Sequence, residues 1–205
     1  MVYLITSGTS SHDSLRQDYF EPSLKLCEPV EWLHFQRQSQ DPGNFMKGDW
    51  LDSVGWATRN ALDATKIVPQ GRVMVIADLD ITWLPGAFTE LESIAQNGIW
   101  AMRENRKGLI NTGIIASRNT SPFRWLLDQV IEEMESSRVH DQDALRNIAF
   151  DRVNLLPSSF ANTKTLGMTK RKDILCYHAI CSIADDQESS VEKKKKLLDK
   201  FIDGD

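Results

Sequence analysis

The sequence lacks the features that mark membrane-spanning and secreted proteins. No apolar run reaches the roughly 20 residues that a transmembrane helix needs. The N-terminal stretch MVYLITSGTSS has no basic region, and its apolar part is too short for a signal peptide. We therefore expect a cytoplasmic protein without a membrane span.

The chain also lacks an excess of positive charge, and cysteine is scarce. The net charge is −5, which disfavours a nucleic-acid partner, although a local basic groove is compatible with it. The three cysteines lack a Cys-x-x-C spacing, so buried free thiols are expected in place of disulfides or a zinc site. Repeats and clear linkers are missing, and the length suits a single domain over residues 1–205.

The pattern of apolar residues predicts alternating strands and helices. The stretch GRVMVIADLD (71–80) is apolar on both faces, which is typical of strands covered by helices on both sides. These features predict a layered α/β/α fold of Rossmann type with a mainly parallel central sheet. Other strands are expected at 2–6, 30–35, 98–103, 153–157 and 173–178, with one ending the segment 108–117. Helices are expected at 13–26 with a break at Pro22, at 49–66 from a cap at Asp49, at 87–96, at 121–136 with Ser121 as the cap, at 141–150 and at 191–202.

Two carboxylates follow the apolar run of VMVIADLDITW. Ligands of such sheets bind beyond the carboxyl ends of the strands, where Asp78 and Asp80 fall. Side chains at i and i+2 of a strand point to one side, with Cα atoms about 6.5 Å apart. Asp78 and Asp80 are therefore placed to flank a divalent ion, which takes oxygen ligands and shares them with phosphates. A nucleophilic carboxylate, or two residues that end a strand and cap a turn, are the alternatives.

The nucleophile alternative rests on DLDIT, which resembles the first motif of the haloacid-dehalogenase phosphatases. That resemblance implies Asp78 as the nucleophile, Asp80 as acid and base, and a magnesium ion. The remaining motifs of that family would fall on Ser117, on Lys170 or Lys172, and on Asp185 and Asp186. In that family the first motif lies on the first strand of the domain, whereas about 70 residues precede it here.

Three further motifs follow the aspartate pair in order. They are NTG (111–113), the pair Asp141 and Gln142 at a helix start, and His178 at the end of the apolar run LCYH. This order resembles the GT-A nucleotide-sugar glycosyltransferases, the glycogenin-like and related families, over most of the chain. The resemblance implies a GT-A-like fold and transfer of a hexose or pentose from a nucleotide-sugar donor, typically a UDP-sugar.

The resemblance also implies a metal site. Asp78, Asp80 and His178 would hold Mn²⁺ or Mg²⁺, and Asp78 would also approach the ribose of the donor. Such an ion bridges the two phosphates and offsets the charge that develops on the leaving diphosphate. Taken alone, His178 would be interpreted as a buried core histidine.

Further residues correspond to donor-binding positions of these families. Residues 6–8 (Thr6, Ser7 and Gly8) follow the first strand, where the base and ribose bind, and a plain turn is the alternative. Asn111 and Gly113 would lie near the donor sugar, because Asn offers both a donor and an acceptor and Gly permits close approach. A strand-entry turn is the alternative for this pair.

The catalytic positions implied by the resemblance are Asp141 and Gln142, beside the anomeric carbon. A carboxylate or amide dipole there stabilises an oxocarbenium-like state. Asp141 also suits the N-cap of a helix, and the two roles are compatible. Families with this arrangement retain the anomeric configuration, so we predict retention.

The chain departs from the pattern after His178, where the family's Gly and Lys-Pro-Trp are missing. A phosphate-binding basic residue is therefore sought elsewhere, with Arg59 preferred to Lys66 or to a residue of the C-terminal helix. The run Lys193–Lys196 is predicted to be a solvated helix face.

The leading hypothesis is thus a metal-dependent glycosyltransferase, against a phosphatase and a non-catalytic nucleotide-sugar-binding module. The acceptor, whether glycan, protein or small molecule, would meet the variable segments 36–48 and 158–172. Because the chain is short for this group, the acceptor site is expected to be small or completed by another chain, such as a second copy in a homo-oligomer.

Overall fold

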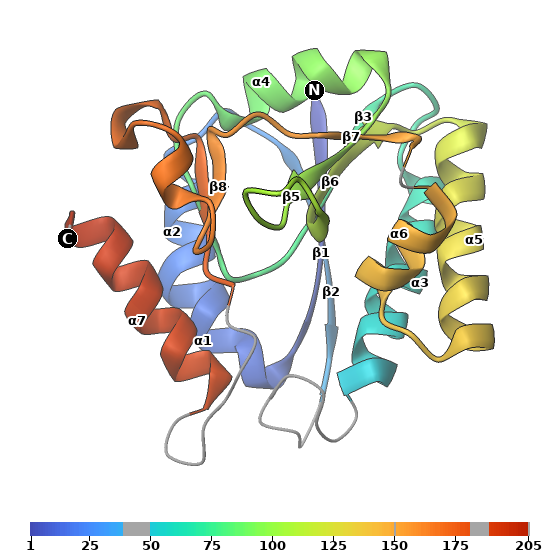
Figure 1. Ribbon diagram of the computed structural model, residues 1–205, viewed down its shortest axis with the longest axis horizontal. Helices are drawn as coiled ribbons and strands as arrows, with labels where there is room; N and C mark the ends of the chain where they lie inside the picture. The colour runs from blue at the N-terminus through green and yellow to red at the C-terminus, as the bar shows by residue number, and fades with distance from the viewer. Residues whose placement is uncertain (39–49, 150, 181–188, 205) are drawn as a thin grey trace.

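The structure is a computed structural model that describes residues 1–38, 50–149, 151–180 and 189–204 (Figure 1). A six-stranded sheet crosses its centre in the order β2-β1-β3-β6-β5-β7. These strands are β1 (Val2–Thr9), β2 (Glu31–Arg37), β3 (Val73–Ala77), β5 (Ile99–Arg103), β6 (Ile110–Arg118) and β7 (Val153–Leu155). All neighbouring pairs are parallel except the two that involve β6, so the expected mainly parallel sheet is confirmed.

A second, three-stranded sheet lies beside the first. It comprises β4 (Ile81–Trp83), β9 (Cys176–His178) and β8 (Phe160–Asn162), with β9 in the middle. Strand β4 pairs antiparallel with β9, which joins the chain just after the aspartate pair to the segment that ends in His178.

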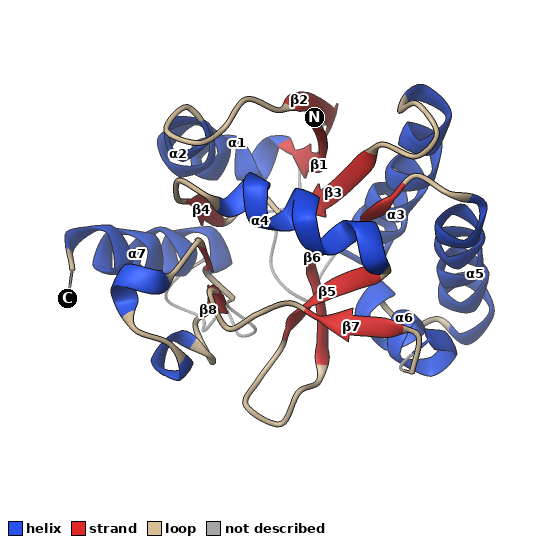
Figure 2. Ribbon diagram, turned by 90° about the horizontal axis from the view of Figure 1, so that it is seen from above, coloured by secondary structure: helices blue, strands red, loops and turns tan. Residues whose placement is uncertain are grey.

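Helices cover both faces of the central sheet, as the apolar strands predict (Figures 1 and 2). One side carries α3 (Trp50–Ile67), α5 (Ser121–Ser137) and α6 (Asp141–Ala149). The other side carries α1 (Asp13–Leu15), α2 (Glu21–Leu24), α7 (Ser190–Asp203) and the second sheet, while α4 (Ala87–Ile94) runs across the top of Figure 1. Among the described residues, no helix is both long enough and apolar enough to cross a bilayer.

The core forms on both faces of the sheet because adjacent strand residues point to opposite sides. Ile5 and Met74 pack in the cluster under α3 and α5, whereas Leu4 and Val75 pack in the cluster that includes Trp83. A third cluster, which includes Tyr177, Leu198 and Phe201, lies between α7 and the second sheet.

Several element boundaries differ from those expected. The strand predicted over 71–80 ends at Ala77, and the aspartates lie in the turn that leads to β4. Pro22 does not end the helical segment, and it lies in the first turn of α2. A π-helical stretch at Arg16–Phe20 precedes it.

At α5, Ser121 is the first helical residue. Thr120 takes the cap position, without a side-chain cap bond. Strand β8 lies within the segment 158–172, which was expected to be a variable acceptor-binding loop. The proposed cap Asp49 lies outside the described residues.

Candidate metal and donor site

Asp78, Asp80 and His178 come together at the carboxyl edge of the central sheet. One ligand atom from each lies within 4.8 Å of the others. His178 Nε2 is 3.1 Å from Asp80 Oδ1 and 3.4 Å from Asp78 Oδ2. The side chains of Asp80 and His178 are 4% exposed, whereas that of Asp78 is 58% exposed. The group is therefore closed on one side and open to solvent at Asp78.

Backbone pairing brings these three residues into reach. The Asp78 N–H donates to the Gly113 carbonyl at 3.0 Å, which ties the turn to β6. Ile81 pairs with His178 in the β4–β9 ladder, and the Ala179 N–H donates to the Asp80 carbonyl at 2.9 Å. Two ligands thus come from one turn, and the third comes from a strand hydrogen-bonded to that turn.

Gly113 makes room for the His178 ring. A Cβ at this position would lie 2.2 Å from His178 Cε1 and 2.4 Å from Nδ1. Gly8 likewise makes room for the turn that carries the two aspartates. A Cβ added at Gly8 would lie 2.4 Å from Leu79 Cδ1. The sequence resemblance had assigned both glycines to the donor, and the structure gives each a packing reason of its own.

The charges of the cluster are unevenly distributed. Partial desolvation beside the buried group and the neighbouring Asp80 carboxylate raise the pKa of Asp78 above its usual range. Burial opposes ionisation of Asp80, but Lys194 and His178 outweigh it and hold the pKa of that carboxyl below its usual range. Burial likewise disfavours the charged ring of His178, yet Asp80 outweighs it and raises the pKa of the imidazole.

The donor set fits a divalent cation. Two carboxylates and one imidazole are ligands that manganese accepts, and carboxylates alone suit magnesium. The ring nitrogen of His178 that faces the carboxylates is Nε2. In the described part of the chain, its buried Nδ1 has no hydrogen-bond partner.

Lys194 reaches the same cluster from α7, which the sequence did not predict. Its Nζ lies 2.8 Å from Asp80 Oδ2, and its side chain is 18% exposed. The prediction of a solvated face is therefore wrong for Lys194. It shares the buried stripe of α7 with Val191, Leu198 and Phe201, at helical spacings of three and four residues. That spacing is the signal that would have identified it.

Asn111 is the centre of a hydrogen-bond network. Its Nδ2 donates to Glu104 Oε2 and to Gln142 Oε1, both at 2.8 Å, and its Oδ1 accepts from the Gly113 N–H at 2.9 Å. Glu104 also pairs with Lys164. Asn111 thus holds Gln142 of α6 against β6. The sequence did not reveal the pair of Glu104 and Lys164, because these two residues are 60 positions apart.

Replacing Asn111 with alanine is expected to lower the free energy of unfolding by about 1–3 kcal/mol, because buried Glu104 loses a donor. Urea denaturation measures this change. Asn147→Ala, at an exposed residue that bonds Glu133, is the matched control and should stay within about 0.5 kcal/mol. If both variants lost the same free energy of unfolding, the hydrogen bonds of Asn111 would not stabilise the fold more than those of an exposed asparagine.

Thr6, Ser7 and Gly8 do not follow the first strand as expected, because β1 continues to Thr9 and includes all three. Thr6 and Ser7 have different surroundings. Thr6 is buried, and its Oγ1 bonds His34 Nδ1 at 2.8 Å and accepts from Trp32 Nε1 at 2.9 Å.

Ser7 accepts from Asn60 Nδ2 at 3.2 Å and faces a cavity of about 70 Å³. The polar residues that line this cavity include Ser7, Asp78, Thr112 and Asp141, and most of the others are apolar residues of the sheet, α3, α5 and α6. The first strand, the aspartate turn and the start of α6 therefore meet at one place.

The basic residues proposed for the phosphates lie elsewhere. Arg59 is half-exposed and its Nη1 pairs with Glu135 Oε1 of α5 at 3.0 Å. Lys66 pairs with Asp63 on the surface of α3 at 2.6 Å. Instead of a basic residue, α3 presents Ala57, Thr58 and Ala61 to the cavity.

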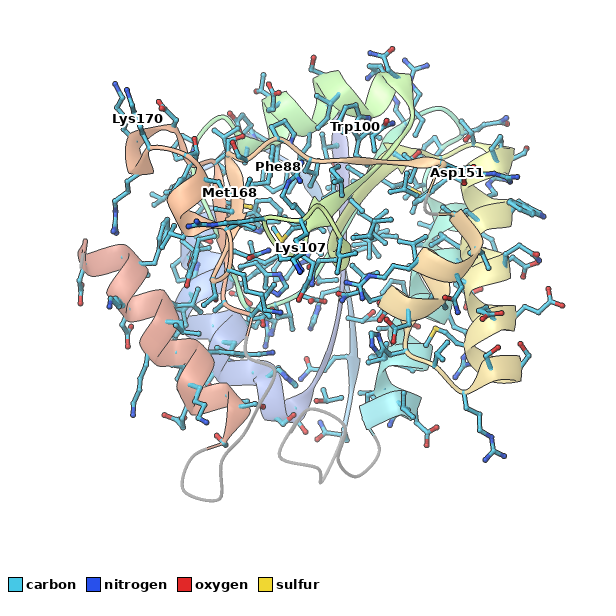
Figure 3. All side chains as sticks on the ribbon, in the orientation of Figure 1. Phe88, Trp100, Lys107, Asp151, Met168 and Lys170 are labelled. Atoms are coloured by element: carbon cyan, nitrogen blue, oxygen red, sulfur yellow. The ribbon has the colours of Figure 1, made fainter. Side chains whose placement is uncertain are left out.

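Among the residues that the structure describes, the phosphatase motifs do not come together. Ser117 pairs with Met74, near the opposite end of β3 from Asp78. Lys170 lies at the outer edge of the molecule beyond the second sheet (Figure 3), and Lys172 is exposed. Asp185 and Asp186 lie outside the described residues.

Comparison with known proteins identifies the fold. No protein-family model and no curated protein sequence matches the chain. Among solved structures, the glycosyltransferase GlyE of Streptococcus pneumoniae TIGR4 aligns over 98% of this chain with 14% identity and a TM-score of 0.62. The chain spans 63% of the length of that protein.

Two further structures match over nearly their whole length. A glycosyltransferase involved in glycosylation of the major capsid of PBCV-1 has 12% identity and a TM-score of 0.65, covering 97% of this chain and 98% of its own. The galactosyltransferase LgtC, solved with donor and acceptor sugar analogs, has 11% identity and a TM-score of 0.60, covering 97% and 95%. The chain therefore has the GT-A fold of these glycosyltransferases, and the resemblance seen in the sequence is confirmed at the level of the fold.

Proposed function

We propose that this protein is a metal-dependent glycosyltransferase that uses a nucleotide-diphospho-sugar, with a UDP-sugar as the expected donor. One observation carries the proposal. The Asp78–Asp80–His178 group lies at the carboxyl edge of a GT-A sheet, with ligand atoms within 4.8 Å of one another. This edge is where open α/β sheets bind their ligands.

The three side chains would hold Mn²⁺ or Mg²⁺. When bound, such an ion neutralises charge on the two phosphates and on the departing nucleoside diphosphate. Asp78 is the exposed member of the group, so it is the ligand that we expect to face the donor.

Asp141 and Gln142 are the proposed catalytic residues. Asp141 lines the cavity together with Asp78, and Asn111 fixes the amide of Gln142. During transfer the bond from the anomeric carbon to the diphosphate breaks, and the acceptor hydroxyl forms the new bond and loses its proton. A carboxylate or amide oxygen beside that carbon stabilises the positive charge that develops there, and we propose that the configuration is retained.

The test is calorimetry of UDP with and without Mn²⁺, followed by assays of UDP-sugar hydrolysis and transfer. Manganese-dependent UDP binding with donor hydrolysis is the expected result. Binding with neither hydrolysis nor transfer would identify a non-catalytic binding module. Hydrolysis of a generic phosphate ester, inhibited by beryllium fluoride and lost in Asp78→Asn, would overturn the proposal in favour of a phosphatase.

A further inference from the structure

Lys194 places a positive charge on a residue of the candidate metal group. Its Nζ contacts Asp80 Oδ2 at 2.8 Å, while Asp80 Oδ1 faces His178 at 3.1 Å. Both oxygens of this carboxylate are therefore engaged by nitrogen atoms of the protein. A lysine and a carboxylate as buried as this pair, 18% and 4% exposed, attract each other more strongly than a surface pair does.

A divalent ion at this group would meet that ammonium. Two cations that share one carboxylate repel each other, and the repulsion is large where water is excluded. The ion and Lys194 therefore compete for Asp80, and the affinity for the ion is reduced by the stability of the lysine contact.

We propose that Lys194 is an internal counter-ion that occupies Asp80 in the metal-free protein and must leave it when the ion binds. Lys194 thus sets the metal concentration at which the site fills. The inference rests on the proposed function, because it requires that the group binds a metal ion.

The fold allows Lys194 to leave without undocking α7. The helix is also held by the third apolar cluster, in which the Tyr177 and Phe201 rings stack at a centroid distance of 4.4 Å. Arg171 covers the Phe201 ring at 4.9 Å. The lysine side chain is a flexible four-carbon stem, so its ammonium can move while its backbone stays in place.

The test is the affinity of the nucleotide-free protein for Mn²⁺, measured by titration calorimetry. Lys194→Ala is expected to bind manganese about 10- to 100-fold more tightly than the wild type, since the ion no longer displaces a charged hydrogen bond. Lys194→Met retains the apolar stem and should show the same gain. Lys195→Ala is the matched control, because Lys195 is the next residue of the helix and pairs with Asp18 at 3.5 Å.

Two results would overturn the inference, and they differ from failure of the proposed function. Unchanged manganese affinity in both Lys194 variants, beside measurable binding by the wild type, would show that the lysine does not compete. Metal-free UDP binding by the wild type that is lost in Lys194→Met would show that the lysine substitutes for the ion. Absence of manganese and UDP binding in every variant, Lys194→Ala included, would refute the proposed function itself.

A second readout is amide hydrogen exchange in α7. Manganese should speed amide hydrogen exchange in the first turns of α7 of the wild type, because the ion removes the contact between Lys194 and Asp80. In Lys194→Met, exchange there should be fast already and should not respond to manganese. Exchange that slows equally in both proteins would contradict displacement.

Discussion

Replacing Asp80 with alanine is expected to abolish manganese-dependent binding of UDP, with a loss in affinity of more than about 100-fold. Asp80 is the only described residue of the group in contact with both His178 and Lys194, at 3.1 and 2.8 Å. Its removal therefore deletes one ligand and also the carboxylate that contacts both His178 and Lys194. Titration calorimetry of UDP in the presence of Mn²⁺ measures the effect.

The controls separate loss of the ligand from loss of the fold. Asp80→Asn keeps the shape of the side chain and should fold, while it loses the negative charge that the ion requires. Asp63→Ala removes an exposed aspartate that pairs with Lys66 on α3, and it should bind UDP and manganese as the wild type does. Retention of manganese-dependent binding in both Asp80 variants would refute the metal site.

Replacing Gly113 with alanine is the second change with a large expected effect. The new methyl group would lie 2.2 Å from His178 Cε1, so the buried ring has to move. Moving a ring that supplies a ligand is expected to lower manganese affinity by about 10- to 100-fold, the range seen when the surroundings of metal ligands are altered. Titration calorimetry of Gly113→Ala with Mn²⁺ measures the change in affinity.

Gly167→Ala is the matched control for this glycine. Its Cβ would meet the end of the flexible Arg106 side chain at 3.1 Å, which can move aside at small cost. This variant should bind manganese normally. If Gly113→Ala also bound the ion normally, with an unchanged melting temperature, then the close approach to His178 would be irrelevant to the site.

The layered architecture was predictable because it depends on local patterns. Strands apolar on both faces, such as β3, require a helix layer on each side, and the amphipathic pattern of α3 and α5 supplies one. The order of the motifs was equally visible. It led to the expectation that His178 lies near Asp80, and the two side chains are in contact.

Tertiary contacts explain what the sequence did not reveal. The run KKKK is interpreted as four solvated lysines, and only the spacing of Lys194 from the apolar residues of α7 distinguishes it. The sequence does not indicate that its partner is the distant Asp80. The sequence resemblance implies that Gly113 leaves space for the donor sugar. In the structure, the group that approaches Gly113 closely is the ring of His178. Arg59 was preferred as the phosphate-binding residue because of its position on α3. Its guanidinium instead pairs with Glu135 of α5, a contact that the sequence does not predict.

The ends of elements were the other source of error. VMVIADLDITW is one apolar run interrupted by two aspartates, and periodicity alone does not divide it into two strands that belong to different sheets. β4 and β8 are three residues long, and each is a strand only because β9 lies between them.

The short ladder between β4 and β9 also determines when the site can form during folding. Its three pairs join residues about a hundred positions apart, and such non-local contacts are made late because closing a long loop is entropically costly. Side chains alternate along a strand, so a slip of one residue in this ladder would turn His178 to the opposite face of the second sheet. A folding intermediate with a complete central sheet and all its covering helices would therefore still lack affinity for the ion until these three pairs had formed in register.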